Sequence, residues 1–210
     1  MKKYLLLSFV LIAFIILSAY SYSYAVNETL SNNVFRLHVI ANSDNEEDQN
    51  LKYKVRDELI KYMETLTTSS NTKEEVIQIA NNHLEDFKTI AENVIKENGF
   101  DYDVNVEIGN FSFPTKQYGD ISFPAGFYDA LKVQIGEAKG QNWWCVMFPP
   151  LCFVDVTSGV VPEESKANLE ENLGQEEYDI ISNDEDSEII DFKFKIVEFF
   201  ENLGIKLANN

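Results

Sequence analysis

The chain has 210 residues, of which 17 are basic and 35 are acidic, so its formal charge is −18. This acidity excludes a protein that follows a nucleic-acid backbone, which needs a basic surface to displace counterions, and it disfavours adhesion to an anionic membrane face. A hydrophobic content of 45% is enough to build a core and excludes general disorder.

Residues 1–25 have the pattern of a secretory signal peptide. Two lysines precede an apolar run over 5–17, and the segment ends in small residues at Ser23 and Ala25. The run is short for a bilayer span, which needs about 20 residues, and an uncleaved anchor is the alternative interpretation. Cleavage before Val26 removes both lysines and leaves 15 basic and 35 acidic residues, a formal charge of −20.

The next segment predicts a strand followed by two helices. Residues 34–40 alternate as in a strand, and Ser43 with Glu46 forms a capping box, with the serine as N-cap, that opens the first helix. Thr72 with Glu75 forms a second capping box. The helix that it opens has an apolar stripe and a C-terminal stop at Asn98-Gly99.

Three later stretches predict strands. Residues 102–108 and 131–135 alternate apolar and polar side chains, as half-buried strands do. Residues 143–148 are apolar on both faces, which indicates a central strand or a strand beneath a cover. The order of elements predicts an α+β fold, in which a sheet carries two helices packed on one face. One such domain would occupy 26–162.

Charge sets the C-terminal part apart. Residues 163–191 contain 12 acids and one base, and a block of this kind repels itself and buries little. We therefore expect an acidic flexible linker over 163–187. Beyond it, apolar residues at helical spacing predict a C-terminal amphipathic helix over 188–206.

Cys145 and Cys152 are the two cysteines of the chain and lie on either side of Pro149-Pro150. If the flanking apolar runs form a hairpin, the two face each other with Cβ atoms about 4.5–5.5 Å apart, so that modest adjustment allows a disulfide. An oxidising compartment favours that bond. The alternative is a pair of buried thiols that behave as small hydrophobic residues.

The sequence contains no recognised catalytic or metal-binding motif. His38 lies in a predicted strand and His83 on a helical stripe, where a packing role accounts for both. Two thiolates with two distant histidines make a poor zinc site. We therefore predict no enzymatic activity, no metal and no cofactor. Two alternatives stay open: a secreted enzyme with Cys145 as nucleophile, and a wall- or ligand-binding module that uses exposed tryptophans at 143 and 144.

Several stretches form a combined pattern that is very unlikely by chance. They are Arg36-Leu37-His38-Val39-Ile40-Ala41-Asn42-Ser43-Asp44, then Phe113-Pro114-Thr115-Lys116 with Phe123-Pro124-Ala125-Gly126, and Asn142-Trp143-Trp144-Cys145-Val146-Met147-Phe148-Pro149-Pro150. The pattern resembles the stage II sporulation protein R family over about residues 34–156. Members of that family often have a basic residue where His38 stands. As surface or packing candidates we take Arg36, Asn42, Asp44, Phe113, Pro114, Pro124, Gly126, Trp143, Trp144, Pro149 and Pro150.

The resemblance implies a signalling protein of endospore-forming bacteria, made in the forespore and secreted into the forespore–mother cell intermembrane space. There the family triggers stage II sporulation protein GA, a membrane-embedded aspartic protease of the mother cell, from its extracytoplasmic face. That protease removes the pro-sequence of sigma E. The resemblance supplies no catalytic residues, and we expect neither a nucleic acid nor a small-molecule substrate as partner.

We expect the exported chain to begin at Val26. Ser23 and Ala25 provide the small side chains that signal peptidase requires at positions −3 and −1. Terminal sequencing and an intact mass of the exported protein check this. An active protein that still carries residues 1–25 would identify an uncleaved anchor instead.

Overall fold

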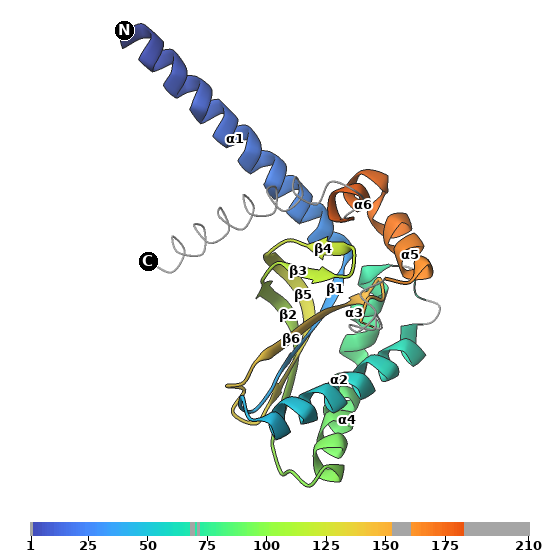
Figure 1. Ribbon diagram of the computed structural model, residues 1–210. Helices are drawn as coiled ribbons and strands as arrows, with labels where there is room; N and C mark the ends of the chain where they lie inside the picture. Colours follow the sequence, from blue (N-terminus) through green and yellow to red (C-terminus); the bar gives the residue numbers. More distant parts are fainter. Residues whose placement is uncertain (1, 68–69, 71, 153–160, 183–210) are drawn as a thin grey trace.

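The computed structural model describes residues 2–67, 70, 72–152 and 161–182, in which a mixed sheet has helices on one face and a smaller cover on the other (Figure 1). The predicted α+β fold is confirmed. In chain order the elements are α1 (Lys2–Asn33), β1 (Phe35–Ile40), α2 (Glu46–Thr67), α3 (Lys73–Asn82), α4 (Leu84–Glu97), β2 (Val104–Phe113), β3 (Lys116–Tyr118), β4 (Ile121–Phe123), β5 (Gly126–Ile135), β6 (Asn142–Phe148), α5 (Glu163–Leu173) and α6 (Gln175–Ile181).

The four-stranded sheet has the order β2-β5-β1-β6. β1 runs parallel to β5 and antiparallel to β6, so Leu37 pairs with Leu131 on one side and with Cys145 on the other. β2 runs antiparallel to β5. The short strands β3 and β4 form a separate antiparallel hairpin, which we call the flap.

The helix-side face of the sheet carries the larger hydrophobic core. Alternate residues of β1, namely Phe35, Leu37 and Val39, point into it as the sequence predicts, and all three are fully buried. Leu59 of α2 and Phe87 of α4 pack against them in the same cluster. At about 25 cal/mol per Å² of buried apolar area, this layer is the main source of folding free energy.

The ends of the helices agree with the sequence in part. The Thr72 hydroxyl accepts from the Glu75 backbone N–H, as a capping box requires. At the end of α4, Gly99 has φ 82° and the Phe100 N–H reaches the Ile95 carbonyl, a Schellman stop. The prediction of one helix between these points is wrong: the helix breaks at His83 into α3 and α4.

Ser43 is not the N-cap of α2, which corrects the first capping box. The helix begins at Glu46, and the Asn45 carbonyl accepts its first bond, from the Gln49 N–H. The Ser43 hydroxyl donates instead to the Asp48 carboxylate at 2.6 Å. The same oxygen accepts from the Asn45 backbone N–H at 3.2 Å, which lies before the first helical residue. The hydroxyl therefore stabilises the loop that leads into α2 and does not cap its first turn.

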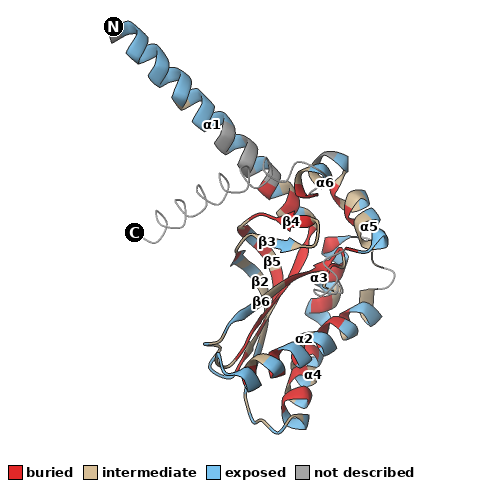
Figure 2. Ribbon diagram, viewed as in Figure 1, coloured by how far each residue is buried: buried red, intermediate tan, exposed pale blue. Residues whose placement is uncertain are grey.

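The opposite, outer face of the sheet is covered in its upper half (Figure 2). The flap, the end of α1 and helices α5 and α6 supply this cover, and they bury Leu30, Ile121, Leu169, Leu173 and Ile181 in a second hydrophobic cluster. The expected flexible linker over 163–187 is therefore wrong for its described part. Leu169 and Leu173 lie one turn apart and face the sheet, while the surrounding acids face solvent.

β6 is an edge strand of the four-stranded sheet and lies beneath covers on both faces. Cys145 and Met147 belong to the helix-side core, and Val146 belongs to the outer cluster. This arrangement explains why its sequence is apolar at every position. Of the two alternatives that the sequence left open for residues 143–148, a central strand or a strand beneath a cover, the structure shows the second.

Helix α1 runs without interruption through the predicted leader and into the domain. Leu5 and Phe9 are 69% exposed, whereas Leu30 is fully buried. Within the described part of the chain, none of the helices is long and apolar enough to cross a membrane. The predicted helix over 188–206 lies outside the described residues, as does the end of the predicted linker.

We expect Leu169→Ala to lower the free energy of unfolding by about 2–5 kcal/mol, the usual cost of a cavity at a buried leucine. Urea unfolding followed by tryptophan fluorescence measures this. Glu171→Ala is the matched control, because Glu171 lies on the exposed side of the same helix and should change stability by less than about 0.5 kcal/mol. Equal stability of both variants would show that α5 is not part of the core.

Candidate functional site: the outer face of the sheet

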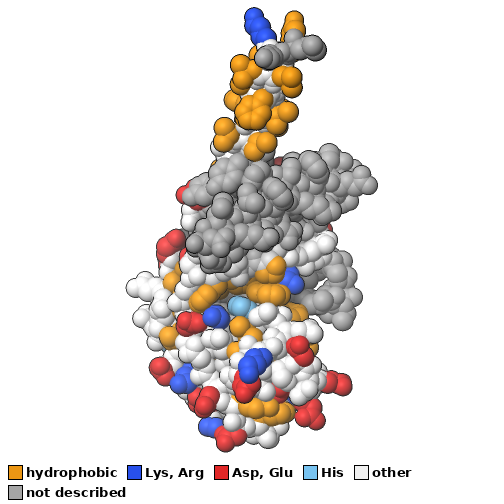
Figure 3. All heavy atoms as spheres, turned by 90° about the vertical axis from the view of Figure 1, so that its left-hand side faces the viewer, with side chains coloured by type: hydrophobic (Ala, Val, Ile, Leu, Met, Phe, Trp, Pro, Cys, Tyr) orange, Lys and Arg blue, Asp and Glu red, His pale blue; other side chains and the backbone are white. Residues whose placement is uncertain are grey.

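The outer face of the sheet brings together residues from four distant segments of the chain. Strand register places Arg36 beside Ala130 and Val146, and His38 beside Lys132 and Trp144. Phe111 and Phe113 of β2 lie on the same face, opposite Tyr128 and Gly126 of β5. Figure 3 shows this face, with hydrophobic side chains gathered around a histidine and basic side chains beside them.

Arg36 lies at the centre of this face and is fully buried. Its guanidinium carbon is 4.2 Å from the centre of the Phe113 ring and 4.7 Å from that of Tyr128, with the Phe123 ring at 5.7 Å. Nη2 donates to the Tyr118 hydroxyl at 2.8 Å, and that hydroxyl donates to the Trp144 carbonyl at 3.1 Å. An aromatic cage thus takes the place of water around the charge.

The buried guanidinium is costly for the fold. Within the described residues, Nε and Nη1 of Arg36 have no hydrogen-bond partner. A charge removed from water without an ion pair loses several kcal/mol of solvation free energy. Three cation–π contacts of about 0.5–2 kcal/mol each and one charge-assisted hydrogen bond offset this loss in part.

The flap closes the cage from the solvent side. Burial raises the pKa of the Tyr118 hydroxyl, against the lowering effect of Arg36. At the flap tip, Asp120 forms an ion pair with Lys166 of α5 at 2.5 Å, and this bond raises the pKa of Lys166. Ile121 makes an isolated β-bridge with Ser182. The C-terminal helices therefore hold the flap over Arg36.

His38 and Trp144 mark the boundary between the covered and the open part of the outer face. The imidazole stacks on the Trp144 ring at 5.6 Å, and its Nε2 is 2.7 Å from the Asn142 Oδ1. Burial lowers the pKa of His38 below its usual value, and the charges of Lys132 and Arg36 act in the same direction. The side chain is therefore neutral at pH 7.

Asn42 and Asp44 lie away from this face and lock two loops together. The Asn42 side chain donates to Asp48 at 2.8 Å and accepts from the Glu137 backbone N–H at 2.9 Å. Asp44 accepts from the Gln141 N–H at 2.8 Å. The loop after β1 is thus tied to the loop between β5 and β6, which gives both residues a structural role.

Asp48 and Lys52 are buried polar anchors of the same loop lock. Burial alone would raise the pKa of Asp48, but hydrogen bonds from Ser43 and Asn42 lower it. The Lys52 ammonium donates to the Gln49 side chain at 2.6 Å and to the Gln141 carbonyl at 3.0 Å, while burial lowers its pKa.

Pro124 and Gly126 belong to the turn into β5, where Gly126 lets the end of α1 approach the sheet closely. The Pro124 carbonyl accepts from the Tyr128 hydroxyl at 2.9 Å. A Cβ atom on Gly126 would lie 2.4 Å from Nδ2 of Asn27, and Asn27 donates to the Ala125 carbonyl. Only glycine permits this close approach, which explains its place in the motif. Pro114 lies half-buried in the turn that leads into the flap.

Cys145 and Cys152 are joined by a disulfide, with Cα atoms 5.4 Å apart. Pro149 and Pro150 form the turn between them, and the Val146 carbonyl accepts from the Cys152 backbone N–H. The turn borders a groove of about 700 Å³ between α2 and α5. No described cysteine is free, so the alternative of a Cys145 nucleophile has no support in the structure.

Trp143 and Trp144 are half-buried on opposite faces of β6. Arg56 of α2 stacks on Trp143 with its guanidinium carbon 4.2 Å from the ring centre, and Lys116 of the flap stacks on Trp144 at 4.6 Å. Both rings are therefore engaged by the domain itself. The alternative of a wall-binding module on exposed tryptophans loses its main basis.

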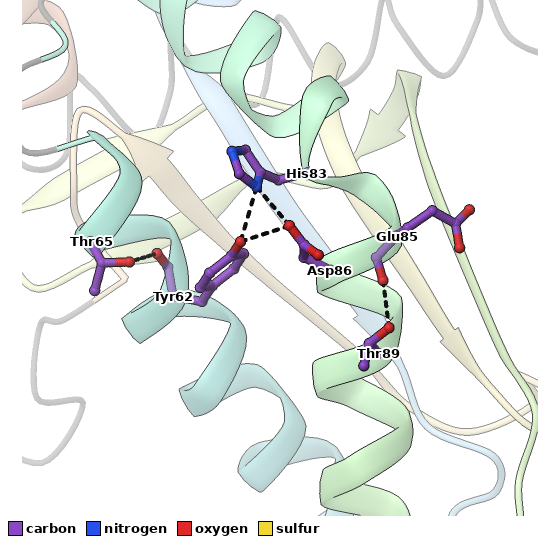
Figure 4. A network of polar contacts seen from close by, with 6 residues as sticks. All are labelled: Tyr62, Thr65, His83, Glu85, Asp86 and Thr89. Carbon is purple, nitrogen blue, oxygen red and sulfur yellow. Dashed lines mark hydrogen bonds and ion pairs between the residues drawn. The ribbon is translucent and has the colours of Figure 1, made fainter.

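A polar network of Tyr62, His83 and Asp86 lies on the helix layer (Figure 4). Asp86 Oδ2 is 2.7 Å from the His83 Nδ1 and 2.9 Å from the Tyr62 hydroxyl, and these bonds lower the pKa of Asp86. His83 occupies the break between α3 and α4, and Tyr62 comes from α2. The network ties α2 to the junction of α3 and α4.

Several residues of the outer face were not among the predicted candidates, and Phe111, Tyr118 and Lys132 are examples. The sequence contains a signal for Lys132, because in the alternating run 131–135 it falls on the face opposite the core. Tyr118 comes to Arg36 through the flap, and no local pattern indicates that contact. Within the described residues, no cluster of three His, Cys, Asp or Glu side chains could hold a metal ion.

Comparisons with known proteins agree with the resemblance. The family described as stage II sporulation protein R (spore_II_R) matches residues 31–158, which include all strands from β1 to β6. Stage II sporulation protein R of Bacillus subtilis (strain 168) is 35% identical over 179 residues, covering 80% of this chain and 80% of that protein. No solved structure matches the chain.

We expect Arg36→Lys to destabilise the domain by more than about 2 kcal/mol, because an ammonium group is more strongly hydrated and cannot stack between rings. Arg36→Met should change the free energy of unfolding by less than about 1.5 kcal/mol, since it fills the cage without a charge. Urea unfolding gives both values. Tyr118→Phe is the control that removes only the hydrogen bond between Arg36 and the Tyr118 hydroxyl. An Arg36→Lys variant as stable as the native chain would contradict this account of the cage.

Proposed function

Because the chain belongs to the stage II sporulation protein R family, we propose that it is the secreted signal that activates a membrane-bound protease during sporulation. In this proposal it acts in the space between the forespore and mother-cell membranes. Its receptor is the aspartic protease stage II sporulation protein GA, approached from the extracytoplasmic face. The response is removal of the pro-sequence of sigma E.

One observation favours a protein that acts by binding over an enzyme. Motif residues from four segments, among them Arg36, Phe113 and Trp144, converge on a sheet face of packed aromatic and basic side chains. Within the described residues, no reactive group lies among them in a catalytic arrangement. The nucleophile considered from the sequence, Cys145, is 1% exposed and part of a disulfide. A rigid surface of this kind suits a ligand that acts by binding.

Binding alone can send a signal through a membrane if the receptor has two conformations or assembly states. The ligand shifts the equilibrium toward the state that it binds better. A change from 1:99 to 99:1 requires about 5.5 kcal/mol of differential binding free energy. An interface of ordinary size buries about 800 Å² on each partner, which a single sheet face can provide.

We expect the purified chain to restore cleavage of the sigma E precursor when it is added to receptor vesicles from the extracytoplasmic side. Activation should saturate near one chain per receptor binding site, since a ligand is not consumed and does not turn over. The measurement is the fraction of precursor cleaved as a function of chain concentration.

Two controls complete the experiment. Receptor vesicles without the chain set the basal rate, and the chain with precursor but without receptor tests for proteolysis by the chain itself. Equal cleavage with and without the chain, or cleavage in the receptor-free mixture, would refute the proposal.

A further inference from the structure

The lower half of the outer face is left open by the flap. We call it the open patch and define it by His38, Phe111, Lys116, Lys132, Asn142 and Trp144. The ammonium of Lys116 lies 4.6 Å from the Trp144 ring centre, and that of Lys132 lies 4.7 Å from the Phe111 ring centre. His38 pairs with both Lys132 and Trp144 across the strands, so the patch is continuous.

The open patch is basic although the chain as a whole is strongly acidic. Lys116 makes no ion pair within the described residues, and its charge rests on an aromatic ring. Lys132 has one acidic neighbour, Glu107 at 3.0 Å. Arg36 lies directly behind the patch and adds a positive charge that no described carboxylate neutralises. A local positive field on an acidic protein orients the molecule toward a negatively charged partner.

The same patch contains a buried donor without a partner. Among the described residues, the Trp144 indole Nε1 has no hydrogen-bond partner, although the atom is buried. Buried polar groups in native proteins nearly always have a partner, so an unpaired donor at the edge of this surface indicates an acceptor that comes from another molecule. An indole N–H can only donate.

The groove between α2 and α5 has the opposite character. The groove beside Pro149 and Pro150 is lined by Glu64 and Glu171 and by no basic residue. It has no charge that would attract an acidic segment. The helix-side surface of α2 and α4 carries acids of its own and pairs them with its lysines, as in Lys61 with Glu58 and Lys88 with Glu92.

We propose that the open patch is the receptor-contacting surface, and that it binds a carboxylate-bearing segment on the extracytoplasmic side of the receptor. This inference rests on the proposed function. The partner's carboxylates lie against Lys116 and Lys132 and accept hydrogen bonds from their ammonium groups. The aromatic rings beneath the two lysines fix the positions of the charges.

The test compares two charge-reversed variants of the full chain. Lys116→Glu with Lys132→Glu changes the patch, and Lys61→Glu with Lys88→Glu makes the same change of net charge on α2 and α4, where the lysine side chains are 72% and 44% exposed. Binding to the receptor in vesicles is titrated at low and at physiological salt. The patch variant should bind on the order of tenfold more weakly with a reduced salt dependence, since rim charges act on association rate. The control variant should bind within about threefold of the native chain, because charges distant from an interface are screened.

A second measurement does not depend on changes of charge. A photoreactive side chain at Gln117, which is exposed on the flap beside Lys116, should crosslink to the receptor, and the same group at exposed Asn81 of α3 should not. Circular dichroism and urea unfolding confirm that each variant is folded.

The outcomes separate the two proposals. Native binding by the patch variant, or crosslinking at position 81 and not at 117, overturns the patch while the proposed function stands. A native chain that does not bind the receptor at all overturns both.

Discussion

The central strand β1 is buried along its whole length and on both faces. The arrangement of the other elements around the sheet depends on this burial. A strand in that position needs a cover on each side of the sheet. The helix layer supplies one cover, and the flap with the ends of the described chain supplies the other. Because β1 also carries Arg36 and His38, the second cover has to accommodate polar groups, and it does so with aromatic rings, a tyrosine hydroxyl and the Asn142 side chain.

Local patterns predicted the elements well, because strand alternation and caps depend on neighbouring residues. Thr72 and Gly99 mark ends of helices as expected. The prediction of Ser43 as an N-cap was wrong, since the helix begins only at Glu46 and the Ser43 hydroxyl bonds the Asn45 N–H and the Asp48 carboxylate in the preceding loop. The prediction of a flexible linker after residue 162 was wrong for a related reason. The segment is strongly acidic overall, but it also contains a short stripe of leucines. The helix that carries this stripe is stabilised by packing of the leucines in the outer hydrophobic cluster.

The sequence predicted some members of the site, such as Arg36, Phe113 and Trp144, but missed others, such as Phe111, Tyr118 and Lys132, and it did not predict the geometry. The motif residues divide into those that fasten loops, such as Asn42, Asp44 and Gly126, and those that form the outer face, such as Arg36, Phe113 and Trp144. The sequence offers no means to separate these groups. The division follows from strand register and from the position of the flap, which places Tyr118 on a residue 82 positions away in the chain.

The parallel pairing of β1 with β5 has a consequence for the order of folding. Arg36 meets Ala130, and the outer cover joins Leu30 near one end of the described chain to Ile181 near the other. Contacts of such long sequence separation form late, because the entropy of closing large loops is lost before they become favourable. We therefore expect the outer face to be completed late in folding, after the segment that ends at Ile181 has been synthesised.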